Sequence, residues 1–220
     1  MMRFENYIKN KQVKHFIFKG VEIFVKNSIT NNISAKSVIN KAFQMLPRQM
    51  LINLDTIYIG DFDFLRKREV QAMYENSSIF VTNIQDSEED MIDDIIHEVA
   101  HSIEEIHGRD IYSDGKLERE FLNKREKLWT LLDRKGLDVD LDDFLETSFS
   151  YEFLYKKVGY PVLASLTANL FYSPYAATSL REYYANAFEA FFLKQDVDRL
   201  KKISPIAYKK IIELTVVEDK

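Results

Sequence analysis

The amino-acid sequence predicts an α+β protein, with a small mixed or antiparallel sheet and one helix in its first part and a mostly helical second half. Three observations support this prediction. Runs of β-branched and aromatic residues, typical of strands, all lie before residue 85. Apolar residues at three- and four-residue spacing, typical of helices, dominate after that point. Only 6 glycines and 4 prolines occur among 220 residues, which favours helices over a sandwich or barrel.

The first 85 residues are expected to form the sheet. Segments 16–18 and 21–25 predict a β-hairpin, because Lys19-Gly20 between them suits a tight turn. Further strands are predicted at 54–60, 72–74 and 78–83, with a loop at 61–68. The apolar stripe of 33–46, ended by Pro47, predicts the one helix that crosses this sheet.

Helices are predicted for most of the remaining chain. A Ser-x-x-Asp capping box from Ser87 to Asp90 begins a helix that we expect to end at Gly108. A charged amphipathic helix is predicted at 116–134. The other predicted elements are two helical pieces broken at Gly159, a helix from Leu180 to about Lys194 capped by Thr178 or Ser179, and a last helix at 206–214.

These elements are expected to form a single domain over residues 1–220, a length typical of one domain. Its expected parts are a sheet-rich part at 1–85, a helix at 86–108 that carries the main motif, a helical insert at 109–172, and two closing helices at 173–220.

Composition excludes several kinds of function. The net charge of −5, with both signs interspersed, shows no basic stripe, so no nucleic-acid partner is expected. The absence of cysteine excludes disulfides, thiolate zinc sites and a cysteine nucleophile. The most apolar segment, 158–171, is too short to cross a bilayer, and residues 1–7 lack the apolar core of a signal peptide. We therefore expect a cytoplasmic protein with no membrane partner, leaving open export without a cleaved signal.

The helix predicted to start near Glu88 carries the motif His-Glu-x-x-His, from His97 to His101. Residues four apart on an α-helix lie on one face, so two imidazoles placed in this way can bind the same metal ion. Glu98, beside the first histidine, can then reach a water molecule at that ion. Isoleucine, valine and alanine around the motif indicate a half-buried helix, where unpaired histidines are unfavourable. The motif therefore predicts a zinc site with Glu98 as general base.

Two residues compete to be the third protein ligand that a catalytic zinc ion usually has. His107 lies six residues after His101, and in a continuing helix it points roughly 120° away from the ligand face. Glu182 lies in the first turn of an apolar helix that should pack into the core, where a carboxylate needs a partner. The pattern alone is equally consistent with Glu182 as a capping-box carboxylate paired with Ser179.

The segment 175–192, Tyr-Ala-Ala-Thr-Ser-Leu-Arg-Glu-Tyr-Tyr-Ala-Asn-Ala-Phe-Glu-Ala-Phe-Phe, resembles the closing helix of the anthrax lethal factor–like zincins, which include the clostridial Pro-Pro endopeptidases. Those metallopeptidases combine His-Glu-x-x-His with a later helix whose first glutamate is the third zinc ligand. A tyrosine seven residues before that glutamate stabilises the oxyanion. The resemblance implies a zincin-like fold, with Glu182 as third ligand and Tyr175 as oxyanion donor.

One position departs from the family pattern. The family commonly has a second glutamate four residues after the ligand, where this chain has Asn186. The difference alters an interaction beside the metal, and Glu189 is the residue placed to compensate. The resemblance covers the motif helix and the C-terminal part of the chain, is weak over 1–85, and leaves 110–170 as a longer insert.

The expected function is that of a zinc metalloendopeptidase of the gluzincin type, which hydrolyses peptide bonds with a metal-activated water. His97, His101 and Glu182 would bind Zn²⁺, and Glu98 would take the proton of the water as general base. Tyr175 would donate a hydrogen bond to the tetrahedral oxyanion.

The expected partner is a peptide or protein substrate, extended along an edge strand for which 78–83 is the candidate. The alternative is a non-catalytic zincin-fold protein that binds zinc and has an interaction or regulatory role, to which the insert and Asn186 point. Cleavage specificity and oligomeric state do not follow from the ligands.

Overall fold

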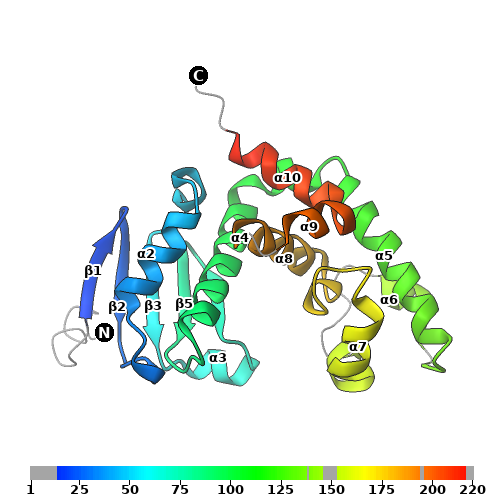
Figure 1. The fold of residues 1–220 in the computed structure, drawn as a ribbon, viewed down its shortest axis with the longest axis horizontal. Coiled ribbons are helices and arrows are strands. Elements are labelled where there is room, and N and C mark those ends of the chain that lie inside the picture. The colour runs from blue at the N-terminus through cyan, green and yellow to red at the C-terminus, as the bar shows by residue number, and fades with distance from the viewer. Residues whose placement is uncertain (1–13, 138, 146–152, 194–195, 217–220) are drawn as a thin grey trace. The chain divides into compact units, whose positions relative to one another are not determined.

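The computed structural model describes residues 14–137, 139–145, 153–193 and 196–216 (Figure 1). The chain forms two compact units, Met1–Ile106 and His107–Lys220. The first holds a small mixed sheet and the second is helical, which confirms the α+β class and the order of its parts. The boundary falls within helix α4 (Glu88–Tyr112), so a single domain over 1–220 stays a prediction. No described helix is both long and apolar enough to cross a bilayer.

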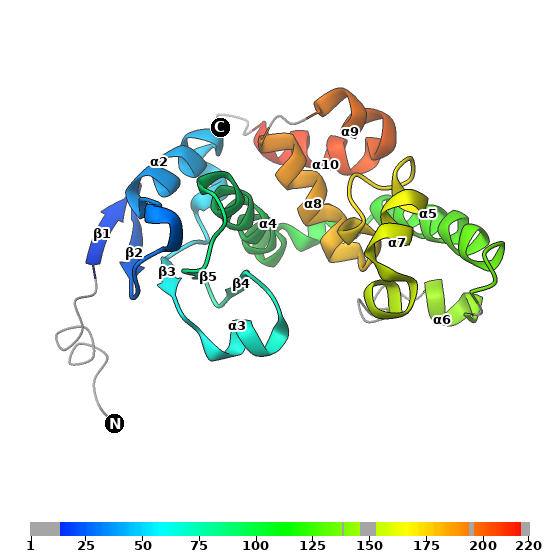
Figure 2. The same cartoon turned by 60° about the horizontal axis from the view of Figure 1, so that its bottom comes forward.

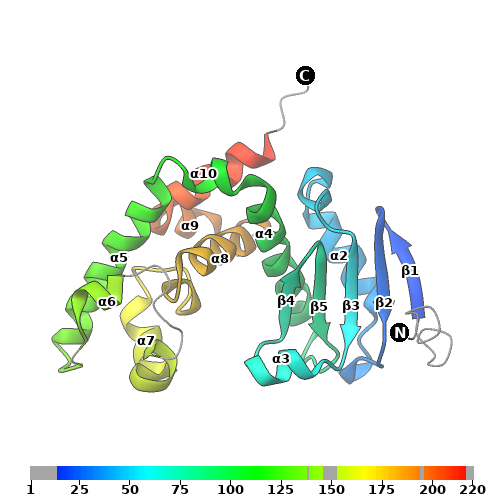
Figure 3. The same ribbon diagram turned by 180° about the vertical axis from the view of Figure 1, so that it is seen from behind.

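The first unit is built on a five-stranded sheet with the strand order β1-β2-β3-β5-β4 (Figure 3). The strands are β1 (Lys14–Phe18), β2 (Val21–Val25), β3 (Thr56–Gly60), β4 (Ala72–Glu75) and β5 (Ser78–Thr82). β1 pairs antiparallel with β2, and β4 pairs antiparallel with β5, whereas β3 runs parallel to both of its neighbours. The predicted strands and hairpin are therefore confirmed.

The hairpin turn forms at the predicted dipeptide. Lys19 and Gly20 have φ values of 50° and 92°. Two successive positive φ values are what a type I′ turn requires, and its twist matches that of the two flanking strands.

One face of the sheet is covered by α2 (Ala35–Met45) and by the first part of α4 (Figures 1 and 3). Side chains alternate along a strand, so every second strand residue points to this face. The buried strand residues of this core are Val21, Ile23, Val25, Ile57, Ile59, Ala72, Ile79 and Val81. The helices contribute Val38, Ile39, Ala42, Phe43, Met91, Ile92, Ile95, Ile96, Val99, Ala100 and Ile103. This core fixes the motif helix against the sheet.

The opposite face of the sheet carries a row of rings across four strands. His15, Phe24, Tyr58 and Phe80 lie opposite one another in the strand register. Their ring centroids are 4.4, 5.4 and 5.1 Å apart, and successive ring planes lie within 16° of parallel. Because the ring faces stack on each other, the row covers this face of the sheet with its own side chains and offers few flat ring faces to a ligand.

Two expectations for the first unit are wrong. Residues 61–68 are not simply a loop, since they contain helix α3 (Asp63–Arg68), which ends at Glu69 with a left-handed φ of 57° (Figure 2). Leu65 is the only buried residue of α3, so the helix has too little apolar periodicity to be recognised from sequence. The segment 78–83 is not an edge, because β5 lies between β3 and β4; β4 is the edge strand on this side.

The second unit contains the end of α4 and a set of further helices (Figure 2). These are α5 (Lys116–Asp133), α6 (Leu141–Leu145), the π-helix η3 (Phe153–Gly159), α7 (Tyr160–Thr167), the 3-10 helix η4 (Tyr175–Ala177), α8 (Leu180–Phe192), α9 (Val197–Ile203) and α10 (Pro205–Thr215). The predicted helices at 116–134 and 206–214 are confirmed, and so is the break at Gly159, which has φ 82°. Lys194, the predicted end of α8, lies outside the described residues.

Two boundaries in this part differ from the prediction. The motif helix continues through Gly108 to Tyr112, because a single glycine costs a helix interior only about 1 kcal/mol. Helix α9 was not predicted, although Asp196 is its N-cap and accepts a 2.9 Å hydrogen bond from the backbone N–H of Arg199.

Helix α5 is central to the second unit. It contacts α6, α7, α8 and α10. Phe121 on α5 packs on Phe171 and on Tyr183 of α8, with centroids 6.2 and 5.5 Å away, and all three residues are buried. The helix expected as part of an insert therefore supports the helix that carries Glu182.

Candidate metal centre

The motif helix α4 begins as predicted. The Ser87 hydroxyl accepts a 3.0 Å hydrogen bond from the backbone N–H of Asp90, so the first half of the capping box is present. Glu88, Glu89 and Asp90 occupy the first turn, where carboxylates interact favourably with the helix dipole. These local interactions and the buried isoleucines fix which face of α4 meets the sheet.

His97 and His101 lie one turn apart on one face of α4. Their ring centroids are 5.2 Å apart with the ring planes at 78°, and a ring nitrogen of one lies within 4.8 Å of a ring nitrogen of the other. Two Zn–N bonds of about 2.0–2.1 Å in a tetrahedral site separate the nitrogens by roughly 3.4 Å, which small ring rotations reach. The chemistry and spacing of the two imidazoles therefore fit a single zinc ion.

Glu98 lies against the edge strand β4. Its side chain is buried, and its Oε2 accepts a 2.6 Å hydrogen bond from the backbone N–H of Tyr74. Hydrogen bonds to an ionised acceptor are short and strong, so this contact orients the carboxylate. The expected general base is thus positioned by the backbone of a strand.

The Tyr74 side chain helps to hold that strand in place. Its hydroxyl accepts hydrogen bonds from Asn53 Nδ2 at 2.8 Å and from the Ser77 backbone N–H at 3.1 Å, and it donates to Glu105 Oε2. Burial, with the Glu105 hydrogen bond, raises the pKa of Tyr74 to about 12, so the phenol keeps its proton. The network joins β4 to α4 next to Glu98.

A second carboxylate orients His101. The Nδ1 atom of His101 lies 2.5 Å from Glu104 Oε2, one turn along α4, and both side chains are nearly buried. When the Nδ1–H group donates a hydrogen bond to this carboxylate, the lone pair of the neutral imidazole lies on Nε2. Histidines that bind metals commonly have such a partner, which fixes the tautomer and the ring orientation.

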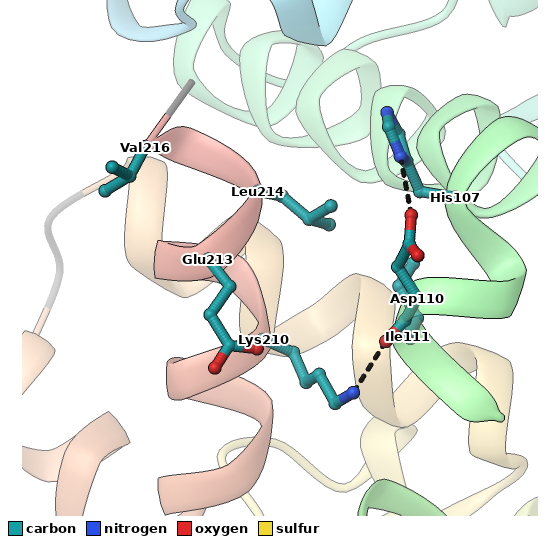
Figure 4. A pocket seen from close by; sticks show the side chains of 7 residues that line it. All are labelled: His107, Asp110, Ile111, Lys210, Glu213, Leu214 and Val216. Carbon is teal, nitrogen blue, oxygen red and sulfur yellow. Dashed lines mark hydrogen bonds and ion pairs between the residues drawn. The ribbon is translucent and has the colours of Figure 1, made fainter. Parts of the chain in front are cut away.

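His107 meets the condition under which we expected it to point away from the ligand face. The helix continues through it, and its Nδ1 lies 3.2 Å from Asp110 Oδ2. It lines a pocket of about 340 Å³ in the second unit, together with Asp110, Ile111, Lys210, Glu213, Leu214 and Val216 (Figure 4). Lys210 donates from Nζ to the backbone carbonyl of Asp110 at 2.6 Å, which joins α10 to the end of α4.

Glu182 and Tyr175 belong to the second unit, in adjacent elements. Ser179 is the N-cap of α8, and its hydroxyl accepts a 3.1 Å hydrogen bond from the backbone N–H of Glu182. Thr178 donates to the Tyr175 carbonyl from its backbone N–H at 3.0 Å and from its hydroxyl at 2.7 Å. The junction of η4 and α8 therefore holds both residues within one hydrogen-bonded turn. Of the two predicted N-caps, Thr178 and Ser179, the structure has Ser179.

Asn186 lies one turn after Glu182 on α8. Its side chain is buried, and its Oδ1 has no hydrogen-bond partner among the described residues. A buried oxygen of this kind is normally satisfied by ordered water or an ion. Glu189, the residue expected to compensate for Asn186, is half-buried on the same helix.

Comparison with known proteins assigns no family to this geometry. No family model matches the chain, and no curated protein or solved structure matches it. The likeness to the lethal factor–like zincins rests on the sequence motifs alone.

Two contacts of the motif were missed by the sequence argument. Glu104 was detectable, because a carboxylate three residues after a histidine lies beside it on a helix. The contact of Glu98 with Tyr74 was not, because a backbone N–H has no sequence signature and the two residues are 24 positions apart.

Proposed function

We propose that the protein is a zinc-dependent metallopeptidase with a zincin-like fold. The observation that carries the proposal is the arrangement on α4 of two imidazoles on one face and an adjacent carboxylate hydrogen-bonded to an edge strand. His97 and His101 would be zinc ligands, and Glu98 the general base. Glu182 would be the third ligand and Tyr175 the oxyanion donor.

The case for Glu182 has two supports. The first is the sequence resemblance, in which the glutamate seven residues after a tyrosine is the third ligand. The second is chemical: with His97 and His101, a carboxylate would complete two imidazoles and one carboxylate, a ligand set found in catalytic zinc sites.

A zinc ion bound by these residues would supply Lewis acidity to the attacking water and to the scissile carbonyl. The residues of the chain would transfer the protons, stabilise the oxyanion and orient a ligand. Glu98 would accept the proton of the water and transfer it to the leaving amine. Tyr175 would donate its hydroxyl proton in a hydrogen bond to the developing oxyanion. Glu104 would keep His101 in the tautomer that has its lone pair on Nε2.

A peptide substrate would pair with β4. This strand has a neighbouring strand only on its β5 side among the described residues, so its other edge has backbone groups for an added strand, apart from the Tyr74 N–H that Glu98 already accepts from. Glu98 is hydrogen-bonded to the same strand at Tyr74, so a peptide lying along β4 would pass the general base. The strand that binds substrate is thus proposed to be β4 in place of 78–83.

The decisive experiment compares wild type with Glu98→Gln, which keeps the shape of the side chain and removes its basicity. We expect about one zinc per chain in both proteins by elemental analysis. Hydrolysis of a diverse peptide library should fall by at least about 10²-fold in the variant, within the range for loss of a general base. Equal cleavage by the two proteins would overturn the proposal.

Two further results would separate the remaining alternatives. One zinc per chain with no cleavage of any peptide by wild type would favour the non-catalytic zinc-binding protein. No zinc in the purified protein, and none after incubation with zinc salt, would exclude both zinc-dependent functions. His97→Ala serves as the matched control, because it should lose zinc as well as activity.

A further inference from the structure

We propose that Arg125, on α5, is a positioning residue that holds the junction of η4 and α8, and thereby Glu182, in place for metal binding. The inference rests on the proposed function for the role of Glu182. It concerns a residue of the long helical segment between the two motifs, for which the sequence suggested no role.

Arg125 is fully buried, and its guanidinium joins two separate segments. Nη1 lies 3.3 Å from the carbonyl oxygen of Ala177 and 3.2 Å from that of Thr178, and donates to both. Nη2 donates to the carbonyl of Phe144 on α6. The Phe144 and Phe121 rings lie 4.5 and 5.4 Å from the guanidinium carbon. Burial lowers the pKa of Arg125 to about 10, so the group stays charged at neutral pH.

The two carbonyls that Arg125 binds lie directly before the N-cap of α8. Ser179 follows Thr178, and its hydroxyl accepts from the backbone N–H of Glu182. Thr178 also donates twice to the Tyr175 carbonyl. A short run of hydrogen bonds therefore connects the guanidinium to both residues that the proposed function needs from the second unit.

A second α5 residue holds α8 just past the candidate ligand. Glu120 accepts a 2.8 Å hydrogen bond from the hydroxyl of the buried Tyr183, the neighbour of Glu182. It also accepts from the backbone N–H groups of Ile206 and Ala207, at the start of α10, at 3.0 and 3.3 Å. Helix α5 thus contacts the chain on both sides of Glu182, by Arg125 before it and by Glu120 after it.

The chain offers a matched control at the adjacent position. Lys124 is also a substantially buried cation of α5 that binds backbone carbonyls, but its Nζ donates to Leu170 and Ile203. Neither carbonyl lies at the junction of η4 and α8. Loss of Lys124 should cost stability of a similar kind while leaving the hydrogen bonds before Glu182 intact; its Nζ does lie 5.7 Å from the centroid of the Tyr183 ring, after Glu182.

The experiment uses the full chain and the variants Arg125→Lys and Lys124→Met, under conditions where thermal denaturation shows both to be folded. Lysine keeps the charge, but it lacks the rigid planar fork with which Nη1 and Nη2 of Arg125 reach carbonyls on two segments. We expect Arg125→Lys to weaken zinc affinity by about 10-fold or more, measured by competition with a chelator, because loss of groups that orient ligands typically costs 10–100-fold. Lys124→Met should change zinc affinity by less than about threefold.

A second readout does not depend on zinc. Amide hydrogen exchange in peptides that cover 176–184 should be faster in metal-free Arg125→Lys than in wild type. In Lys124→Met the increase should lie around 170 and 203 instead. A Ser179→Ala variant then tests whether Arg125 acts through the N-cap of α8. The fold-loss of zinc affinity in the double variant Arg125→Lys/Ser179→Ala should be smaller than the product of the two single fold-losses, because both substitutions act through one cap.

The outcomes separate the two proposals. If wild type binds no zinc, or if Glu182→Gln binds it as well as wild type, the proposed ligand set fails. If wild type binds zinc through His97, His101 and Glu182, but Arg125→Lys matches Lys124→Met in affinity and in exchange at 176–184, the role of Arg125 alone is overturned. If Arg125→Lys does not fold, Arg125→Gln, which keeps one donating amide NH2 group on a shorter, neutral side chain, replaces it with the same expected direction.

Discussion

Glu98 Oε2 and the backbone N–H of Tyr74 are joined by a hydrogen bond of 2.6 Å. The contact connects the proposed general base on α4 with the edge strand on which we expect a peptide to bind. Because the donor belongs to the backbone, only proline at position 74 would remove the N–H group itself. We therefore expect this hydrogen bond to affect the free energy of unfolding independently of catalysis.

Substitution of Glu98 by alanine should destabilise the first unit more than substitution by glutamine. Alanine leaves the part-buried Tyr74 N–H without its acceptor, which costs about 1–3 kcal/mol, whereas the amide oxygen of glutamine can still accept. Urea denaturation of the metal-free proteins measures the difference. Equal unfolding free energies for Glu98→Ala and Glu98→Gln would show that the hydrogen bond contributes nothing to the fold.

Removal of the Glu104 carboxylate should weaken zinc binding while leaving the ligands intact. Glu104→Ala releases the Nδ1 of His101, so we expect an affinity lower by about 10–100-fold, and a smaller loss for Glu104→Gln, which can still accept a hydrogen bond. Chelator competition measures both. The control is Glu105→Gln, a change at the neighbouring carboxylate, which bonds Tyr74 rather than a histidine and should leave zinc affinity unaltered.

His107 should be dispensable for metal binding. We expect His107→Asn to retain about one zinc per chain with an affinity within about threefold of wild type, because the imidazole pairs with Asp110 on a continuing helix. His101→Asn, the matched change at a proposed ligand, should lose the metal. Loss of zinc from both variants would reopen His107 as the third ligand.

Lys124 should make the stability of the protein depend on pH. Burial lowers the pKa of Lys124 to about 8 from its ordinary value of 10.5, so the unfolded chain binds more protons than the folded one between these two pH values. The free energy of unfolding of wild type relative to Lys124→Met should therefore rise from pH 8 to pH 10.5. Denaturation of both proteins at several pH values measures it, and a flat or falling difference would contradict the burial of the ammonium group.

Much of the fold could be predicted because its determinants are local. The hairpin at Lys19-Gly20, the capping box at Ser87 and the cap at Ser179 each depend on residues within a few positions of one another. Helix α3 and the end of α4 were not predicted, because the local sequence pattern is weak in the first and misleading in the second. A six-residue helix with one buried leucine has almost no periodic signal, and Gly108 resembles a helix stop although tertiary packing continues the helix.

The candidate site divides in the same way. The sequence by itself determined that His97, Glu98 and His101 share one helix, because spacings of one and four residues place them in a single turn. It also limited the cap of the helix that carries Glu182 to Thr178 or Ser179. Only the tertiary structure decided that β4 rather than β5 is the edge strand and that a backbone N–H orients Glu98. Likewise, only the tertiary structure showed that a buried arginine 52 and 53 positions away holds the carbonyls before that cap. Strand order and the partners of buried polar groups follow from packing between distant segments, and no local pattern in the chain encodes them.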